Sequence, residues 1–131
     1  MAETAEKRSG APTVLIADDE VMLRLVAAET LQDAGFEVSE AGDGTAAFSM
    51  LQADPSIDLL VSDIKMPGMN GIELAEAGLK LRPGLKVLLM TGYATETLPE
   101  CLRHQGLEIL RKPFDLNRLA ALALGLVGKA A

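Results

Sequence analysis

The sequence contains few of the residues that build covalent or transition-metal sites. Cys101 is the only cysteine and His104 the only histidine in 131 residues. An internal disulfide framework, a cysteine-rich zinc site and a histidine-rich metal site are therefore excluded. Tryptophan is absent and aromatic residues make up only 3% of the chain. The core is therefore expected to consist of leucine, valine, isoleucine, alanine and methionine.

Long apolar segments and an excess of basic charge are also missing. No apolar run approaches the roughly 20 residues of a membrane helix, and the polar start of the chain lacks the apolar region of a signal peptide. The net charge of -7 argues against a nucleic-acid partner, because such binding requires a basic surface. We therefore expect a cytoplasmic protein with no membrane or nucleic-acid partner. Its acidic surface fits protein partners or cation binding instead.

What is present fits one compact domain. The chain is 49% hydrophobic and 24% charged, so it can bury a core of its own. Residues 1–12 are expected to form a flexible tail and residues 13–128 the domain. The sequence shows no internal repeat, low-complexity block or linker to a second domain.

Short apolar runs alternate with stretches of helical periodicity after residue 12. The runs predict strands at residues 14–17, 36–39, 57–62, 85–90 and 107–110. Helices are expected at residues 21–34, 44–53 and 72–81, near Pro99, and from the cap Asp115 to about Val127. Strands that alternate with helices predict an α/β fold, a doubly wound five-stranded parallel sheet with five helices.

Polar residues gather at the carboxyl ends of the predicted strands, where ligands bind in sheets of this kind. In chain order they are Asp18, Asp19, Glu20, Asp63, Thr91 and Lys112. Two carboxylates 4 Å apart repel by about 4 kcal/mol at an effective dielectric constant of 20. A lysine ammonium or a divalent cation must offset that repulsion, and oxygen ligands favour Mg2+ or Mn2+.

Such a site suits the transfer of a phosphoryl group. A metal ion with open water positions can hold a phosphoryl group, while a carboxylate acts as nucleophile and forms an acyl phosphate. The metal, Lys112 and Thr91 would then stabilise the charge on the transferring oxygens. As an ordinary alternative, Asp18 and Asp19 would simply cap the first helix.

Four segments resemble the receiver domains of bacterial two-component response regulators. They are VLIADDE, LLVSDIKMPGMNG, LLMTGYA and LRKPF, and their order and spacing extend the resemblance from about Thr13 to Val127. The resemblance implies a flavodoxin-like fold with strand order 2-1-3-4-5. It also implies a regulatory domain rather than an enzyme, similar to the single-domain chemotaxis regulators.

The resemblance assigns a role to the polar residues at the strand ends. Asp63 resembles the phosphoacceptor, Thr91 the hydroxyl that moves toward the phosphoryl group, and Lys112 the lysine that contacts it. The bond before Pro113 is then expected to be cis. A histidine kinase or a histidine phosphotransfer protein would be the donor. The metal ligands implied for Mg2+, or Mn2+, are Asp18, Asp19, Asp63 and the backbone carbonyl of Lys65.

One position departs from the family pattern. Many receivers carry a tyrosine or phenylalanine on the last strand, three residues before the lysine, where this chain has Ile109. The aromatic half of the usual switch is therefore missing. Tyr93 is a candidate substitute gate over the site, because it lies two residues after Thr91 and is the only tyrosine.

Two helices are expected to form a partner face. The first should pack on the sheet and leave Val21, Met22 and Leu25 exposed at the mouth of the acidic site. The last is apolar, with an expected inner stripe at Leu116, Leu119, Leu122 and Leu126. The two helices together would bind the phosphodonor or a second copy of the chain. Scattered apolar residues are also common on surfaces that bind nothing.

Two other functions stay open on the sequence alone. A degenerate receiver would only bind a partner, and Ile109 and Pro99 favour that interpretation. A Mg2+-dependent phosphohydrolase of the haloacid-dehalogenase type would also use an aspartate at a strand end. It would need a second aspartate where this chain has Lys65. The starting methionine and the missing linkers favour a free-standing protein over a piece of a hybrid kinase.

Overall fold

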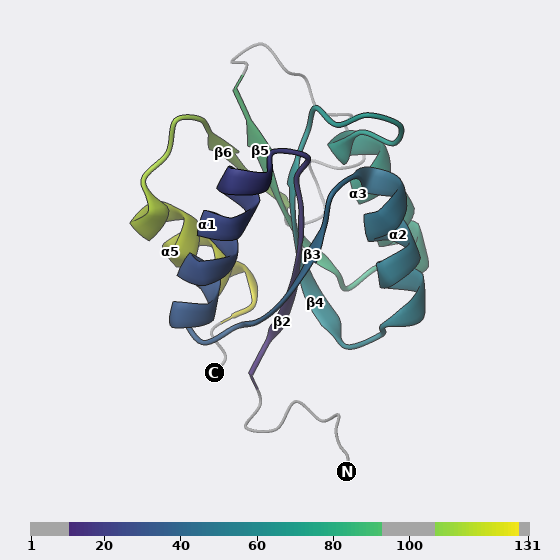
Figure 1. Cartoon of the computed structure of the whole chain (residues 1–131). Coiled ribbons are helices and arrows are strands. Elements are labelled where there is room, and N and C mark those ends of the chain that lie inside the picture. Colours follow the sequence, from purple (N-terminus) through teal and green to yellow (C-terminus); the bar gives the residue numbers. More distant parts are fainter. Residues whose placement is uncertain (1–10, 93–106, 129–131) are drawn as a thin grey trace.

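A single parallel sheet runs through the centre of the molecule (Figure 1). The structure is a computed structural model that describes residues 11–92 and 107–128. The strands are β2 (Thr13–Ala17), β3 (Glu37–Ala41), β4 (Ile57–Asp63), β5 (Lys86–Thr91) and β6 (Leu107–Arg111). They lie in the order β3-β2-β4-β5-β6, and all neighbours are parallel. Counted along the chain this is the order 2-1-3-4-5, so the predicted fold class and topology are confirmed.

Helices cover both faces of the sheet. Within the described residues they are α1 (Val21–Asp33), α2 (Gly44–Ala53), α3 (Gly71–Leu81) and α5 (Leu116–Leu126). Helices α1 and α5 lie on one face, and α2 and α3 lie on the other (Figure 1). The helix expected near Pro99 lies outside the described residues, as do Tyr93, Cys101 and His104.

The strands are apolar on both faces because each face carries its own helices. In β2, Val14 and Ile16 join the core under α1 and α5, whereas Leu15 and Ala17 join the core under α2 and α3. All four side chains are fully buried. This alternation explains why the strand is read in the sequence as a continuous apolar run.

Side chains cap α2, α3 and α5, the helices that follow β3, β4 and β6. Asp43 accepts a hydrogen bond from the backbone of Ala46, and Asp115, as predicted, caps α5 through the backbone of Asn117. Asn70 and Glu73 form a reciprocal capping box at the start of α3. Each of these helices therefore begins at a defined residue, which fixes where the loop before it ends.

Several expected boundaries and faces need correction. The second strand runs from Glu37 to Ala41 rather than over 36–39, because the N–H of Phe36 donates to the carbonyl of Leu31 and so belongs to the turn that ends α1. On α5, Leu116 is 36% exposed, and Ala123 is fully buried beside Leu119. The predicted inner stripe was therefore wrong at Leu116, which lies at the solvent edge of the helix.

The residues just before β2 bear on the expectation of a flexible N-terminal tail. The carbonyl of Pro12 accepts a hydrogen bond from the backbone of Glu37, so ordered contacts begin just before β2. Residues 1–10 lie outside the described part, and the flexible tail stays a prediction.

Among residues 11–92 and 107–128, no helix has both the length and the apolar character needed to cross a bilayer.

Candidate functional site

The carboxyl ends of four neighbouring strands bring the predicted polar residues together. Asp18 follows β2, Asp63 ends β4, Thr91 ends β5 and Lys112 follows β6. Because β2, β4, β5 and β6 are adjacent and parallel, these ends meet at one edge of the sheet. Carboxylate oxygens of Asp18, Asp19 and Asp63 all lie within 4.8 Å of one another.

Asp18 is the most constrained member of this acidic cluster. Its side chain is fully buried, its backbone N–H donates to the carbonyl of Ala41 at 3.1 Å, and its Oδ1 accepts from the backbone of Glu20 at 2.9 Å. Its Oδ2 is buried without a hydrogen-bond partner among the described residues. Burial, assisted by the negative charges of Asp63 and Glu20, raises the pKa of Asp18 to about 6.

The ordinary interpretation of this aspartate pair as helix caps is not supported. Glu20 is the N-cap of α1, and no side chain caps the first turn of that helix. The Glu20 N–H that Asp18 accepts belongs to the cap residue itself, which precedes the helical turn. Asp18 therefore shapes the loop, and Asp19 leaves its carboxylate exposed beside the cluster.

Lys112 brings a positive charge to the acidic cluster. Its ammonium nitrogen lies 3.1 Å from Oδ2 of Asp63 and 3.9 Å from Oε1 of Glu20. Its backbone N–H donates to the carbonyl of Thr91 at 2.7 Å, and the bond to Pro113 is cis, as the resemblance implied. Thr91 is 3% exposed at the end of β5. The hydroxyl and the ammonium thus belong to adjoining strand ends.

The loop after Asp63 folds back tightly over β4. The N–H of Gly71 donates to the carbonyl of Ile64 at 2.8 Å, and Gly68 has a φ of 74°. A Cβ atom on Gly71 would lie 2.2 Å from the carbonyl oxygen of Asp63, so only glycine fits at this position. This contact is the physical reason for glycine at the end of the MPGMNG segment.

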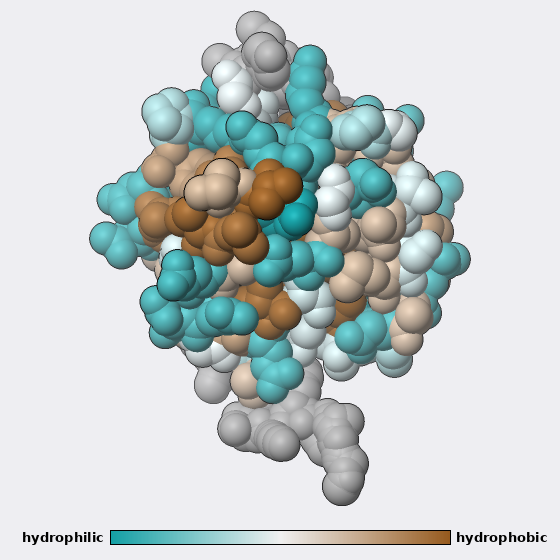
Figure 2. Space-filling model, viewed as in Figure 1, coloured by the Kyte–Doolittle hydropathy of each residue, from teal (hydrophilic) through white to brown (hydrophobic). Residues whose placement is uncertain are grey.

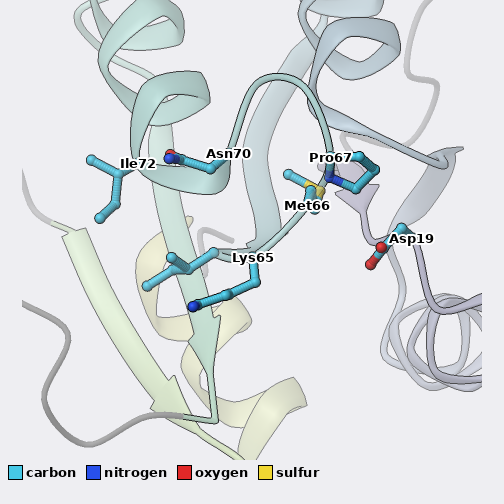
Figure 3. A pocket seen from close by; sticks show the side chains of 7 residues that line it. Asp19, Lys65, Met66, Pro67, Asn70 and Ile72 are labelled. Carbon is cyan, nitrogen blue, oxygen red and sulfur yellow. The ribbon is translucent and has the colours of Figure 1, made fainter.

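A pocket opens between this loop and Asp19 (Figure 3). It is lined by Asp19, Ile64, Lys65, Met66, Pro67, Asn70 and Ile72. Figure 3 shows the ammonium group of Lys65 pointing away from Asp19, while Met66 and Pro67 lie near that carboxylate. The pocket therefore joins the acidic cluster to an apolar rim that the loop provides.

The residues present fit a divalent cation. Three carboxylates converge, one of them buried with an unpartnered oxygen, and Lys112 supplies a single positive charge. An all-oxygen donor set is the chemistry that Mg2+ prefers, whereas zinc favours nitrogen and sulfur. The predicted role of the Lys65 carbonyl as a further ligand stays a prediction.

An apolar surface adjoins the acidic cluster on the α1 side. Val21, Met22, Leu25 and Val26, here called the α1 patch, are 54%, 72%, 48% and 37% exposed. Figure 2 shows apolar residues gathered over this face of the molecule. An apolar pocket next to the patch is lined by Leu23, Val26, Lys112, Pro113, Phe114 and Leu116. The exposure expected of Val21, Met22 and Leu25 is confirmed, and their docking role stays a prediction.

Sequence reasoning missed the residues that hold Asp63 and the loop of residues 18–20, here called the acidic loop, in place. Arg24 contacts Asp18 and Glu40, and Gly71 packs against Asp63. Arg24 is the only basic residue within α1, among apolar, uncharged polar and acidic residues. That isolation was the available signal for Arg24. Nothing in the sequence pointed to Glu40.

The fold and the site together define a doubly wound α/β domain with an acidic cluster and a lysine at the carboxyl edge of its sheet. Residues 14–124 match the model of the response regulator receiver domain family. The chain therefore belongs to the response regulator receiver domains of two-component systems. These are regulatory signalling domains, and the family binds Mg2+ at an acidic cluster.

Individual relatives agree with this assignment. The chain is 36% identical over 107 residues to the response regulator receiver protein CpdR of Brucella abortus, covering 81% of this chain and 88% of CpdR. It is 34% identical over 120 residues to the sensor kinase CckA of the same organism, covering 90% of this chain but 13% of that kinase. A receiver protein structure from Sinorhizobium medicae superposes with a TM-score of 0.79 at 31% identity, covering 90% and 95% of the two chains.

Proposed function

We propose that this chain is a phosphoacceptor whose Asp63 takes a phosphoryl group from a histidine kinase or histidine phosphotransfer protein, in a reaction that needs Mg2+. The observation that carries the proposal is the convergence of Asp18, Asp19 and Asp63 within 4.8 Å, with the Lys112 ammonium 3.1 Å from Asp63. The mutual repulsion of three carboxylates this close destabilises the folded protein unless a cation neutralises them.

Asp63 is the nucleophile of the proposed transfer. One of its carboxylate oxygens attacks the phosphorus of a phosphohistidine, so that a P–O bond forms as the P–N bond breaks. The leaving imidazole keeps the bonding electron pair and takes up a proton. Mg2+, when bound, supplies positive charge for the phosphoryl oxygens. The residues proposed to hold it are Asp18, Asp19, Asp63 and the backbone carbonyl of Lys65.

Lys112 and Thr91 are proposed to stabilise the transferring group. The ammonium of Lys112 already contacts Asp63, so it can also donate to a phosphoryl oxygen attached there. Thr91 ends the strand next to Asp63 and is proposed to donate its hydroxyl to another of these oxygens. Both residues act in transfer to Asp63 and in its later hydrolysis.

The chemistry is tested by incubation with acetyl phosphate and Mg2+, followed by intact-mass measurement. The wild-type chain should gain the mass of one phosphoryl group, and Asp63→Asn should gain none. Asp58→Asn is the matched control, because Asp58 lies on the same strand and its carboxylate accepts a hydrogen bond from Thr13, away from the acidic cluster. A gain of mass by Asp63→Asn, or none by the wild type, would contradict the proposal.

Signalling is proposed to occur through protein contacts at the α1 patch and α5. The patch lies beside the pocket that Lys112 helps to line, so a donor seated there would bring its histidine close to the acidic cluster. The exposed Leu116 and Leu124 extend the apolar surface onto α5. The same face would also serve a homodimer, which sedimentation at increasing protein concentration would detect.

A receiver that only binds a partner is the second candidate, and Ile109 favours it. This side chain is half-buried on β6 and packs against the core under α2 and α3, where the aromatic switch residue is missing. The mass experiment separates the two candidates, because a binding module would gain no phosphoryl group. A pull-down with beryllofluoride then reports whether a partner distinguishes the activated form.

A further inference from the structure

Arg24 joins three elements around the acidic loop. It lies in the first turns of α1, and its Nη1 donates to the backbone carbonyl of Asp18 at 2.8 Å. Its Nε donates to Oε1 of Glu40 on β3 at 3.1 Å. The Arg24 side chain is 18% exposed, so its contact with the Asp18 carbonyl is partly buried, whereas Glu40, at 34% exposed, meets Arg24 at the surface. One guanidinium thus ties α1, the loop after β2 and the edge strand together.

These contacts complete the fixation of Asp18. The carbonyl of Ala41, next to Glu40, accepts the N–H of Asp18 at 3.1 Å, while Arg24 holds the carbonyl of Asp18. With Oδ1 bound to the backbone of Glu20, every polar atom of Asp18 is engaged except Oδ2. The orientation of the Asp18 backbone therefore decides where its free carboxylate oxygen lies.

We propose that Arg24, held by Glu40, is a positioning residue that presents Asp18 for cation binding. The proposal rests on the proposed function, because it assigns Arg24 a task only if the acidic cluster binds Mg2+. Partners of metal ligands commonly change metal affinity by tenfold or more when they are replaced. Arg24 plays that part through the backbone of a ligand rather than through its carboxylate.

Charge and geometry make opposite predictions for this residue. A positive charge beside a cation site repels the cation, so an effect of charge alone would make Arg24→Gln bind Mg2+ more tightly. Arg24→Lys would then behave like the wild type, because it keeps the charge. Positioning instead requires the planar fork of arginine to contact Asp18 and Glu40 at once, which lysine does not reproduce. Both variants should then bind Mg2+ more weakly.

The test measures Mg2+ affinity by isothermal titration calorimetry at a temperature where every variant is folded. We expect Arg24→Lys and Arg24→Gln to weaken binding by about tenfold. Glu40→Ala should weaken it in the same direction. The double variant Arg24→Gln/Glu40→Ala should bind no more weakly than Arg24→Gln, because Glu40 acts through Arg24. Amide exchange at residues 18–20 should quicken in both Arg24 variants while exchange in β4 is unchanged.

Arg82 provides the matched control. It also donates to backbone carbonyls, to Ile57 at 2.9 Å and to Leu51, but at the opposite end of β4. Arg82→Gln should lower the melting temperature without changing Mg2+ affinity. The proposal is overturned if Arg24→Lys binds like the wild type, if Arg24→Gln binds more tightly, or if Arg82→Gln weakens binding as much. Absence of Mg2+ binding by the wild type would instead reject the proposed function itself.

Discussion

The ammonium nitrogen of Lys112 lies 3.1 Å from Oδ2 of Asp63. In the protein without metal this ion pair offsets part of the repulsion within the acidic cluster, so Lys112 and a cation compete to neutralise the same carboxylates. With a phosphoryl group on Asp63 they would cooperate instead, because both face its oxygens. The proposed function therefore predicts opposite effects of Lys112 on metal binding and on phosphoryl transfer.

Replacing Lys112 by glutamine should separate these effects. Without the ammonium, Mg2+ affinity should rise about threefold to tenfold, because one nearby positive charge is removed. The rate of phosphorylation by acetyl phosphate should fall about 100-fold, since the donor to the transferring oxygens is lost. Calorimetry and timed intact-mass measurements give the two numbers. Lys80→Gln on α3 is the control, and equal changes in both variants would refute a specific role for Lys112.

Asp18→Asn should stabilise the protein in metal-free buffer. The pKa of Asp18 is raised from an ordinary 3.8 to about 6, so the folded state holds a proton that the unfolded state releases between these values. The cost of the charged carboxylate therefore grows as pH rises through that window and is complete above pH 6. At pH 7.5 the variant should gain about 1–3 kcal/mol in its free energy of unfolding, measured with urea.

The control for this prediction is the neighbouring Asp19→Asn, which removes an exposed carboxylate of the same cluster. Its free energy of unfolding should change by less than about 0.5 kcal/mol. Excess Mg2+ should stabilise the wild type and leave Asp18→Asn nearly unchanged, because only a site that binds the cation gains stability from it. An Asp18→Asn variant that is less stable at pH 7.5 without metal would show that burial of the charge is not costly.

Leu25→Asp should slow phosphorylation by a protein donor while sparing phosphorylation by acetyl phosphate. Leu25 is 48% exposed within the α1 patch, and a carboxylate there would repel an apolar helix of the donor. The rate should fall about tenfold or more with whichever phosphotransfer protein labels the wild type fastest. Leu81→Asp is the matched control, since Leu81 is 42% exposed on α3 across the sheet. Equal donor rates for wild type and Leu25→Asp would reject the patch.

Two glycine-to-alanine changes in helices should have opposite signs. In Gly71→Ala the new methyl group would lie 2.2 Å from the carbonyl oxygen of Asp63, so the loop or the end of β4 must shift. We expect a loss of at least about 2 kcal/mol in the free energy of unfolding, with weaker Mg2+ binding. Gly125→Ala, on α5, meets no atom within 4 Å and should gain about 0.5–1 kcal/mol. Urea unfolding of both variants checks the pair.

Much of the site was accessible from the sequence because its residues follow strands directly. In a parallel sheet every strand ends at the same edge, so Asp18, Asp63 and Lys112 were expected at one edge of the sheet once the strands were recognised. The strands were recognisable because a strand covered on both faces is apolar throughout, as β2 is. The error on α5 has the opposite origin. Its apolar residues surround the helix, so periodicity alone did not show that Leu116 is exposed.

The sequence by itself determined the succession of strands and helices along the chain and the residues of the acidic cluster, because these depend on local apolar patterns and on what directly follows each strand. The order of the strands within the sheet was implied by the resemblance to receiver domains. Only the tertiary structure decided how the cluster is held. Arg24 and Glu40 are 16 residues apart, and Gly71 meets Asp63 through the fold of the loop between them. Such contacts depend on side-chain reach and backbone curvature, which leave no periodic trace in a sequence.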